Sequence, residues 1–264
     1  MTRTKTPAAK GEGWQGWDSY AAFYDWENAQ TVQRRDVAFW QRLAAVADGP
    51  VLELGCGTGR ITVPVGRSGA HVVGIDRSLP MLERAVRKLR RARLTRDALL
   101  VRGDIRHLPF RRMRFPLVMA PYGILQSLTR EQDLVATLTS VARVMPKGGR
   151  FGIDLVPELP RWSEYEGRKT MSGRMGRGTA VSLVESVTQD RARRLTIFDQ
   201  RYVTTRGGVR RNHRFSLMFR TLSIRQMSSR LDAAGFEIDV VLGDYRGGPW
   251  DARADVWVIL ASKR

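Results

Sequence analysis

The feature of this sequence that most constrains its fold is the stretch VLELGCGTG at residues 51–59. An apolar run that contains one acid, Glu53, leads directly into three glycines, Gly55, Gly57 and Gly59, each two residues from the next. Glycine tolerates positive φ and lets a ligand approach the backbone closely, so this pattern predicts a strand that feeds a ligand-binding turn. Dinucleotide folds use the spacing G-x-G-x-x-G, with the pyrophosphate at a helix N-terminus. The different spacing here, with an acid inside the strand, predicts a cofactor that has no pyrophosphate.

Strand and helix patterns alternate along the chain on both sides of an irregular middle segment. Helix starts are signalled by a predicted N-cap at Ser78, and by predicted capping boxes at Thr129 with Gln132 and at Ser223 with Gln226. The alternation predicts a doubly wound α/β fold that closes with a pair of strands. After the first strand, the predicted strands span residues 71–76, 99–104, 115–121, 150–156, 236–242 and 255–261.

Composition limits the domain size, the cellular location and the kinds of ligand that can be expected for this chain. Its 264 residues allow one large domain with embellishments. Cys56 is the single cysteine and has no disulfide partner, which favours a reducing, cytoplasmic location. The apolar runs have strand length and the basic N-terminus lacks an apolar segment, so we expect no membrane association and a disordered tail over residues 1–13. The three histidines are scattered and no metal-binding spacing occurs, so no metal site is predicted.

The glycine turn and the ends of the next two strands resemble the class I S-adenosylmethionine (SAM)-dependent methyltransferases. The resemblance implies a Rossmann-like, seven-stranded, mostly parallel sheet whose last strand is antiparallel. In that family the turn wraps the methionine part of SAM, and the strand acid helps to hold its ammonium group. Asp76 matches the acid that accepts hydrogen bonds from both ribose hydroxyls, and Asp104 matches the acid that accepts from the adenine amino group. Arg77 departs from the pattern, because the family usually has an aliphatic residue there. The resemblance implies SAM as the cofactor and a site made of Tyr24, Glu53, Gly55, Cys56, Gly57, Gly59, Asp76, Arg77, Met81, Asp104, Ile105 and Pro121.

An aromatic-rich segment at residues 14–48 precedes the glycine turn and predicts a helical cap. Tyr24 and Asp25 resemble a Tyr-Asp pair with which many small-molecule methyltransferases close over SAM. Aromatic residues at helical spacing also build ordinary cores, so simple packing is the alternative.

The predicted reaction site follows the fourth strand, because ligands of open α/β sheets bind beyond the carboxyl ends of the strands. Some sugar amine methyltransferases with this layout carry a histidine about where Ser127 stands, and this chain has none there. The hairpin before the last strand resembles a segment that emerges at the substrate end of the sheet in this family. No catalytic residue is predicted, and the candidates for contact with substrate are Tyr20, Tyr122, Gln126, Tyr245 and Trp250.

Residues 157–222 fall outside the strand and helix alternation. Alternating runs near residues 179–188, 195–204 and 213–221 predict an antiparallel β insertion. Residues 161–222 contain 14 basic and 5 acidic residues, so 14 − 5 = +9 of the total formal charge of +19 lies here. These arginines could bind an anionic acceptor or RNA, could remain solvated, or could lie in a dimer contact.

The sequence therefore predicts a methyltransferase that transfers the methyl group of SAM to a nitrogen or oxygen of a small-molecule acceptor, mainly by proximity. No histidine stands at the predicted reaction site to act as a base, and we expect the arginine-rich insertion to select an acceptor that is anionic or becomes so. The alternatives are an RNA methyltransferase that uses the basic insertion, and a non-catalytic protein that binds SAM or nucleic acid. The predicted parts are the tail (1–13), the helical cap (14–48), the SAM-binding core (49–156), the insertion as a substrate lid (157–222), and a C-terminal helix and strand pair (223–264).

Overall fold

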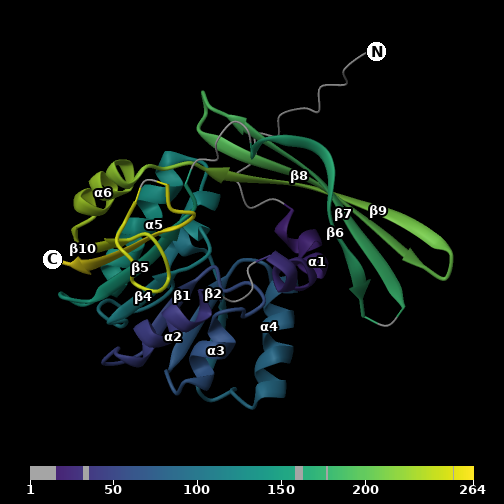
Figure 1. Ribbon diagram of the computed structural model, residues 1–264. Helices are drawn as coiled ribbons and strands as arrows, with labels where there is room; N and C mark the ends of the chain where they lie inside the picture. The colour runs from purple at the N-terminus through teal and green to yellow at the C-terminus, as the bar shows by residue number, and fades with distance from the viewer. Residues whose placement is uncertain (1–15, 32–35, 158–162, 177, 252) are drawn as a thin grey trace.

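The computed structural model describes residues 16–31, 36–157, 163–176, 178–251 and 253–264, and the predicted tail at 1–13 lies outside them. Its core is a seven-stranded sheet in the order β10-β11-β5-β4-β1-β2-β3 (Figure 1). β11 is antiparallel to β5 and β10, and the other neighbours are parallel, which confirms the predicted fold class. The strands are β1 (Val51–Leu54), β2 (Val72–Asp76), β3 (Ala98–Arg102), β4 (Leu117–Ala120), β5 (Arg150–Leu155), β10 (Phe236–Leu242) and β11 (Trp257–Lys263).

Helices cover both faces of this sheet, as a doubly wound fold requires. α2 (Val37–Ala45), α3 (Thr62–Arg67) and α4 (Leu79–Ala92) contribute to one apolar cluster, which includes the fully buried Trp40. α5 (Glu131–Val144) and α6 (Ile224–Ala233) contribute to a second cluster on the opposite face. No helix in the described ranges combines the length and the apolar character that a membrane crossing needs.

Two of the three predicted helix starts are confirmed. Ser78 Oγ accepts a hydrogen bond from the Met81 backbone N–H at the start of α4, and Ser223 and Gln226 form a capping box on α6. The capping box expected at Thr129 and Gln132 is wrong: α5 begins after Arg130, which makes no side-chain cap. Thr129 lies in the short link between the 3-10 turn η2 (Ile124–Ser127) and α5, and it does not occupy the N-cap position. Arg130 occupies that position, and its Nε donates to Asp133 Oδ2 in the first turn of α5 at 2.7 Å.

The insertion forms a separate four-stranded antiparallel sheet in the order β6-β7-β8-β9. The three predicted runs correspond to β7 (Thr179–Asp190), β8 (Leu195–Arg206) and β9 (Val209–Arg220). The edge strand β6 (Tyr165–Met175) is not apparent in the sequence, because it is largely exposed and its register shifts twice against β7. Exposure and irregular pairing both remove the alternation that signals a strand.

Helix α1 (Trp17–Thr31) lies between the insertion sheet and α4 (Figure 1). Its Phe23 ring stacks on Tyr202 of β8, with ring centroids 4.3 Å apart. The Glu27 carboxylate accepts hydrogen bonds from the Tyr20 and Tyr202 hydroxyls and from the Gln200 amide. Apolar packing and a buried polar network therefore join α1 to the insertion, and together they cover the carboxyl edge of the core sheet.

Candidate active site

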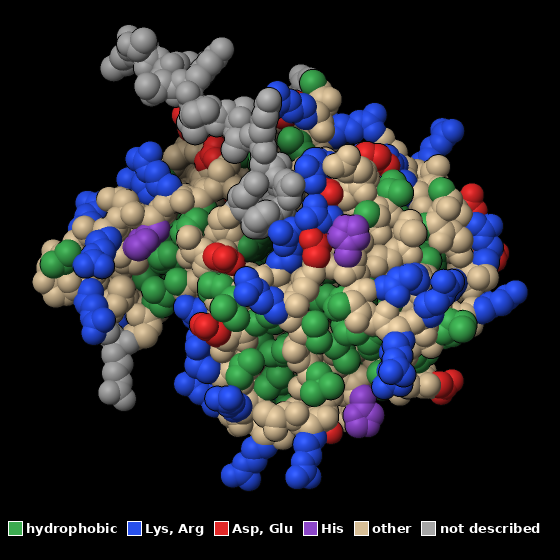
Figure 2. Space-filling view, turned by 180° about the vertical axis from the view of Figure 1, so that it is seen from behind, with side chains coloured by type: hydrophobic (Ala, Val, Ile, Leu, Met, Phe, Trp, Pro, Cys, Tyr) green, Lys and Arg blue, Asp and Glu red, His purple; other side chains and the backbone are tan. Residues whose placement is uncertain are grey.

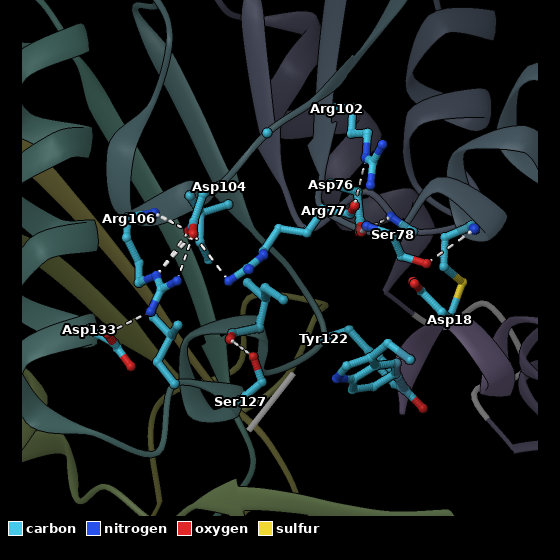
Figure 3. A pocket seen from close by; sticks show the side chains of 18 of the residues that line it. Asp18, Asp76, Arg77, Ser78, Arg102, Asp104, Arg106, Tyr122, Ser127 and Asp133 are labelled. Carbon is cyan, nitrogen blue, oxygen red and sulfur yellow. Dashed lines mark hydrogen bonds and ion pairs between the residues drawn. The ribbon is translucent and has the colours of Figure 1, made fainter. Parts of the chain in front are cut away.

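A cavity of about 560 Å³ lies at the carboxyl ends of the central parallel strands, where α1 and β9 cover the glycine turn. Figure 3 shows it from close by. Its wall includes most of the residues that the sequence predicts for the cofactor, although those residues come from five different segments. They are Tyr24, Gly55, Gly57, Asp76, Arg77, Met81, Asp104, Ile105 and Pro121, and the substrate candidate Tyr122 joins them.

The three glycines of the turn all have positive φ, but they serve different purposes. A Cβ on Gly55 would lie 2.4 Å from Ile124 Cδ1, and a Cβ on Gly59 would lie 3.3 Å from Ala85 Cβ, so these two glycines permit close packing. A Cβ on Gly57 would meet no atom nearer than the Gly55 carbonyl oxygen at 3.9 Å. Gly57 therefore presents bare backbone to open space in the cavity, as a ligand-binding turn should.

Asp76 lies at the end of β2 and connects the two loops that face the cavity. Its Oδ2 accepts from the Gly57 backbone N–H and its Oδ1 accepts from the Ser78 backbone N–H, both at 2.8 Å. Burial raises the pKa of the Asp76 carboxyl, and these backbone hydrogen bonds act to lower it. Each carboxylate oxygen retains a second lone pair, so Asp76 can also accept from a pair of ligand hydroxyls.

Asp104, between β3 and the 3-10 turn η1 (Ile105–His107), is already held by cations. Arg106 contacts both of its oxygens at 2.8–3.1 Å, and Arg77 Nη1 lies 3.1 Å from Oδ2 (Figure 3). Partial burial acts to raise the pKa of Asp104, but Arg106 and Arg77 hold it below its usual value. A ligand amino group would therefore share Asp104 with two guanidinium groups.

Glu53, Cys56 and Gly59 do not line the cavity, and all three are buried. The Glu53 carboxylate accepts a hydrogen bond from the Thr62 hydroxyl, and the Cys56 side chain packs where a Cβ on Gly74 would stand, 2.7 Å from Cys56 Cβ. Burial raises the pKa of Glu53 from its ordinary 4.5 to about 8. The Glu53 carboxyl therefore holds its proton more tightly than an exposed glutamate does, and a nearby ammonium group would favour its ionised form.

This raised pKa makes the stability of the ligand-free protein depend on pH. An acid that binds its proton more tightly when folded contributes stability that is complete below about 4.5 and is lost as pH rises through about 8. We expect the free energy of unfolding of the wild type to fall across that interval relative to that of Glu53→Gln, which keeps an acceptor for Thr62. Urea denaturation of both proteins at several pH values measures this, and parallel curves would show that Glu53 does not titrate there.

Helix α1 is attached to the glycine turn next to Tyr24. Asp25 Oδ1 accepts from the Thr58 hydroxyl at 2.6 Å and from Lys88 Nζ of α4 at 2.7 Å. The sequence does not reveal this attachment, or that Trp17 and Asp18 also line the cavity. Because Tyr24 and Asp25 are adjacent, the attachment fixes the aromatic wall of the cavity.

Tyr122 follows β4 in a turn of uncommon conformation. Tyr122 and Gly123 both have φ near +60°, and the Gly123 backbone N–H donates to the buried Asp154 carboxylate at 2.7 Å. The Arg60 guanidinium lies 4.8 Å from the centre of the Tyr122 ring and pairs with both oxygens of the buried Asp36. The left-handed region is unfavourable for tyrosine, so Asp154 and Arg60 hold the ring in a position that the chain alone would not favour.

The remaining substrate candidates lie outside this cavity. Tyr20 is buried in the cluster between α1 and the insertion, and the Tyr245 hydroxyl donates to Asp154 at 2.8 Å. Gln126 bonds the backbone carbonyls of Val156 and Arg220, which joins the end of β5 to the end of β9. Trp250 is half exposed and contacts Trp257. Their contact with substrate stays a prediction.

Several wall residues are not predictable from the motifs. Ile124 and Phe219 face the cavity, and Arg106 and Asp133 form an ion pair at its edge at 2.9 Å. Arg106 stands two residues after Asp104, and this spacing is only a weak indication that Arg106 lies in the cavity wall. Phe219 gives none, because strand alternation does not reveal where the insertion docks.

Among its described wall residues, the cavity offers hydrogen-bond acceptors and aromatic faces but no strong base beside Tyr122. Desolvation raises the pKa of the Tyr122 hydroxyl to about 12 and also raises the pKa of the Tyr24 hydroxyl, so both phenols stay protonated near neutral pH. None of the wall residues is a histidine. Within the described residues, no group of three or more His, Cys, Asp or Glu is placed to hold a metal ion. Exposed backbone at Gly57, the acceptor Asp76 and the apolar Met81 and Ile105 fit the methionine, ribose and adenine parts of SAM.

Comparison with known proteins agrees with this geometry. Residues 51–149 match a methyltransferase domain family. The cypemycin N-terminal methyltransferase of Streptomyces sp is 26% identical over 242 residues, which cover 91% of this chain and 94% of that protein. A demethylmenaquinone methyltransferase of Streptomyces griseus is 31% identical over 170 residues, 62% of this chain and 69% of that protein. The structure of an S-adenosylmethionine-dependent methyltransferase from Clostridium acetobutylicum superposes with a TM-score of 0.75 at 16% identity, over 93% of this chain and 99% of that one.

Proposed function

The chain belongs to the class I SAM-dependent methyltransferases, with SAM as its cofactor, and we propose that it methylates a nitrogen or oxygen nucleophile of a small molecule. The observation that carries the proposal is the shape of the cavity. The glycine turn, α1 and Phe219 of the insertion line one concave space, and the wall of that space carries both the cofactor candidates and Tyr122. A pocket covered in this way suits a ligand that is largely surrounded by protein. The relative named as an N-terminal methyltransferase supports a nitrogen acceptor.

When bound, SAM supplies a methyl group on a sulfonium, so that an acceptor lone pair can form the new bond as the carbon–sulfur bond breaks and its electron pair remains on sulfur. Asp76 would hold the ribose, and the Gly57 backbone would face the methionine part. The faces of Tyr24 and Tyr122 would contact the cationic end, because aromatic rings attract cations. The protein's contribution is then chiefly to hold the acceptor in line, which can supply several kcal/mol, on the order of 7 or more in well-aligned cases.

The protonation state of the acceptor follows from the groups beside Tyr122. Neither phenol is ionised near neutral pH, so neither can act as a base for the acceptor, and the Arg60 guanidinium over the Tyr122 ring is already paired with Asp36. A nucleophile that is already deprotonated, or that carries a neighbouring anionic group, is therefore favoured over a cationic amine. An assay of neutral, cationic and anionic acceptors across pH tests this; preference for cationic amines would contradict it.

An extended nucleic-acid surface is less well supported. On the face shown in Figure 2, lysine and arginine side chains are dispersed, with acidic side chains among them. An RNA-binding face should instead gather its cations along one path. RNA binding that falls steeply with salt would support the RNA alternative, because each neutralised phosphate releases counterions.

The attachment of α1 should contribute to cofactor binding. Asp25→Ala removes the acceptor that joins Thr58 and Lys88 to α1 beside Tyr24. We expect SAM to bind about tenfold more weakly, since a charge-assisted hydrogen bond contributes more than about 1.4 kcal/mol. Gln30→Ala, on the exposed side of the same helix, is the matched control. Calorimetric titration with SAM measures both, and equal affinities for the two variants would show that α1 does not close the site.

Titration of the folded protein with SAM and with S-adenosylhomocysteine (SAH) tests the cofactor half of the proposal. We expect both to bind with one-to-one stoichiometry and to raise the melting temperature. Circular dichroism confirms that the protein is folded in the same samples. Folded protein that binds neither compound would overturn the proposed function.

A further inference from the structure

A second cavity, of about 170 Å³, adjoins the first one on the far side of Tyr122 and Phe219, which line both. It lies where the ends of β4 and β5 meet strands β8 and β9 of the insertion. Its other lining residues are Gly123, Gln126, Val156, Pro157, Thr196, Phe198, Arg220 and Thr221. A ligand with its reacting atom beside Tyr122 could therefore extend into a separate space under the insertion.

The size and walls of this second cavity suit a ring-sized apolar group. Val156, Pro157, Phe198 and Phe219 supply apolar surface around it. A cavity of roughly 150 Å³ with apolar walls accommodates a molecule the size of benzene. Among the described lining residues, Arg220 carries the single formal charge.

Arg220 is unusual because its charge is only partly balanced and its guanidinium is incompletely bonded. Its Nη2 pairs with Glu131 of α5, and Arg230 pairs with the same carboxylate at 2.8 Å. Two guanidinium groups thus share one carboxylate, which leaves a net charge of +1 in the group. Arg220 Nη1 is buried and has no hydrogen-bond partner in the described part of the chain. A buried donor without a partner is unfavourable, so a shift of the Arg220 side chain that brought Nη1 to an acceptor in the cavity would stabilise the protein.

From these observations we infer that the second cavity is a subsite for the methyl acceptor, and that it takes a ring-sized apolar group bearing a carboxylate that accepts from Arg220. This inference rests on the proposed function, whose acceptor it describes. Arginine and carboxylate form strong, charge-assisted hydrogen bonds, and the excess positive charge favours an anion over a neutral group. Apolar walls with one cationic donor would also reject an acceptor that is polar throughout.

Fluorine NMR tests the subsite with a simple probe. para-Fluorobenzoate is titrated into protein saturated with SAH, with para-fluorobenzyl alcohol as the neutral counterpart. We expect the benzoate to bind at least about tenfold more tightly than the alcohol, and Arg220→Met to remove this preference. Arg230→Lys is the matched control, because it changes the guanidinium on the same carboxylate outside the cavity but keeps the net charge of the group, and it should retain the preference within about twofold. Val156→Phe, at a half-exposed wall position, should fill the cavity and prevent binding of both probes.

The titration with SAH alone separates failure of this inference from failure of the proposed function. If folded protein does not bind SAH, the proposed function itself fails. If SAH binds but benzoate and alcohol bind equally, or Arg220→Met keeps the wild-type preference, only the carboxylate subsite is overturned. Binding that Val156→Phe leaves unchanged would likewise place the probe elsewhere and overturn it.

Discussion

Gly57→Arg should reduce the affinity for SAM and SAH by at least about 100-fold, which corresponds to ~2.7 kcal/mol. Gly57 has φ of +52° and faces the cavity with no side chain within 4 Å of its Cβ position, so a new side chain would extend into the space that the cofactor needs. The backbone N–H of Gly57 also bonds Asp76, and strain in the turn would disturb that acceptor. Calorimetric titration of the folded variant measures the loss.

Gly69→Arg is the control for backbone strain in this experiment. Gly69 also has positive φ, at +89°, and has open space around it, but it lies after α3 and outside the cavity. An arginine in the left-handed region costs about 1–2 kcal/mol at either position. We therefore expect similar losses of stability but a loss of cofactor binding only at Gly57. Near wild-type affinity in Gly57→Arg would show that SAM does not contact this turn.

Arg60→Met should lower the free energy of unfolding by about 3–5 kcal/mol, because it leaves a buried carboxylate without its cation. Asp36 is 1% exposed and receives two hydrogen bonds from Arg60, at 2.8 and 2.7 Å. Arg60 also lies over Tyr122, so the same change should disturb the acceptor side of the cavity. Urea denaturation measures the stability, and SAH affinity reports on the cavity.

The double variant Asp36→Leu with Arg60→Met separates the unpaired charge from the loss of packing. An apolar pair of similar volume often restores the stability that breaking a buried ion pair removes. We expect the double variant to regain most of the free energy of unfolding. The contact between the residue 60 guanidinium and the Tyr122 ring stays lost, because methionine has no guanidinium. Equal instability of the single and double variants would show that packing, and not the unpaired charge, controls this position.

The parts of the site that the sequence predicts are those whose position depends on one short segment of the chain. Gly57 and Asp76 each occupy a fixed place at the end of a strand, and parallel strands bring such ends to one edge of the sheet. Their joint position in the cavity wall therefore follows from local spacing and the strand order. The fold class was predictable for the same reason, since a buried parallel strand such as β4 is apolar throughout.

The parts that escaped prediction depend on contacts between distant segments. Glu27 reads as a surface acid of a helix, yet it is a buried acceptor for Tyr202, 175 residues away. Phe219 and Arg220 belong to a strand whose alternation is visible, but their place beside the two cavities depends on how the insertion docks. The even spacing of the three glycines also does not show that they have different roles. Gly55 and Gly59 make room for Ile124 and Ala85, whereas Gly57 faces the cavity.

The central claim, that this protein transfers the methyl group of SAM to a small molecule, is tested most directly by identifying the methylated product. Purified protein is incubated with isotopically labelled SAM and either a small-molecule extract or total RNA, and each fraction is analysed by mass spectrometry, with Gly57→Arg as the inactive control. We predict labelled methyl groups in a small molecule that carries an anionic group, formed by the wild type and not by Gly57→Arg. Label found in RNA, or SAM bound by the wild type without transfer to any fraction, would contradict the claim.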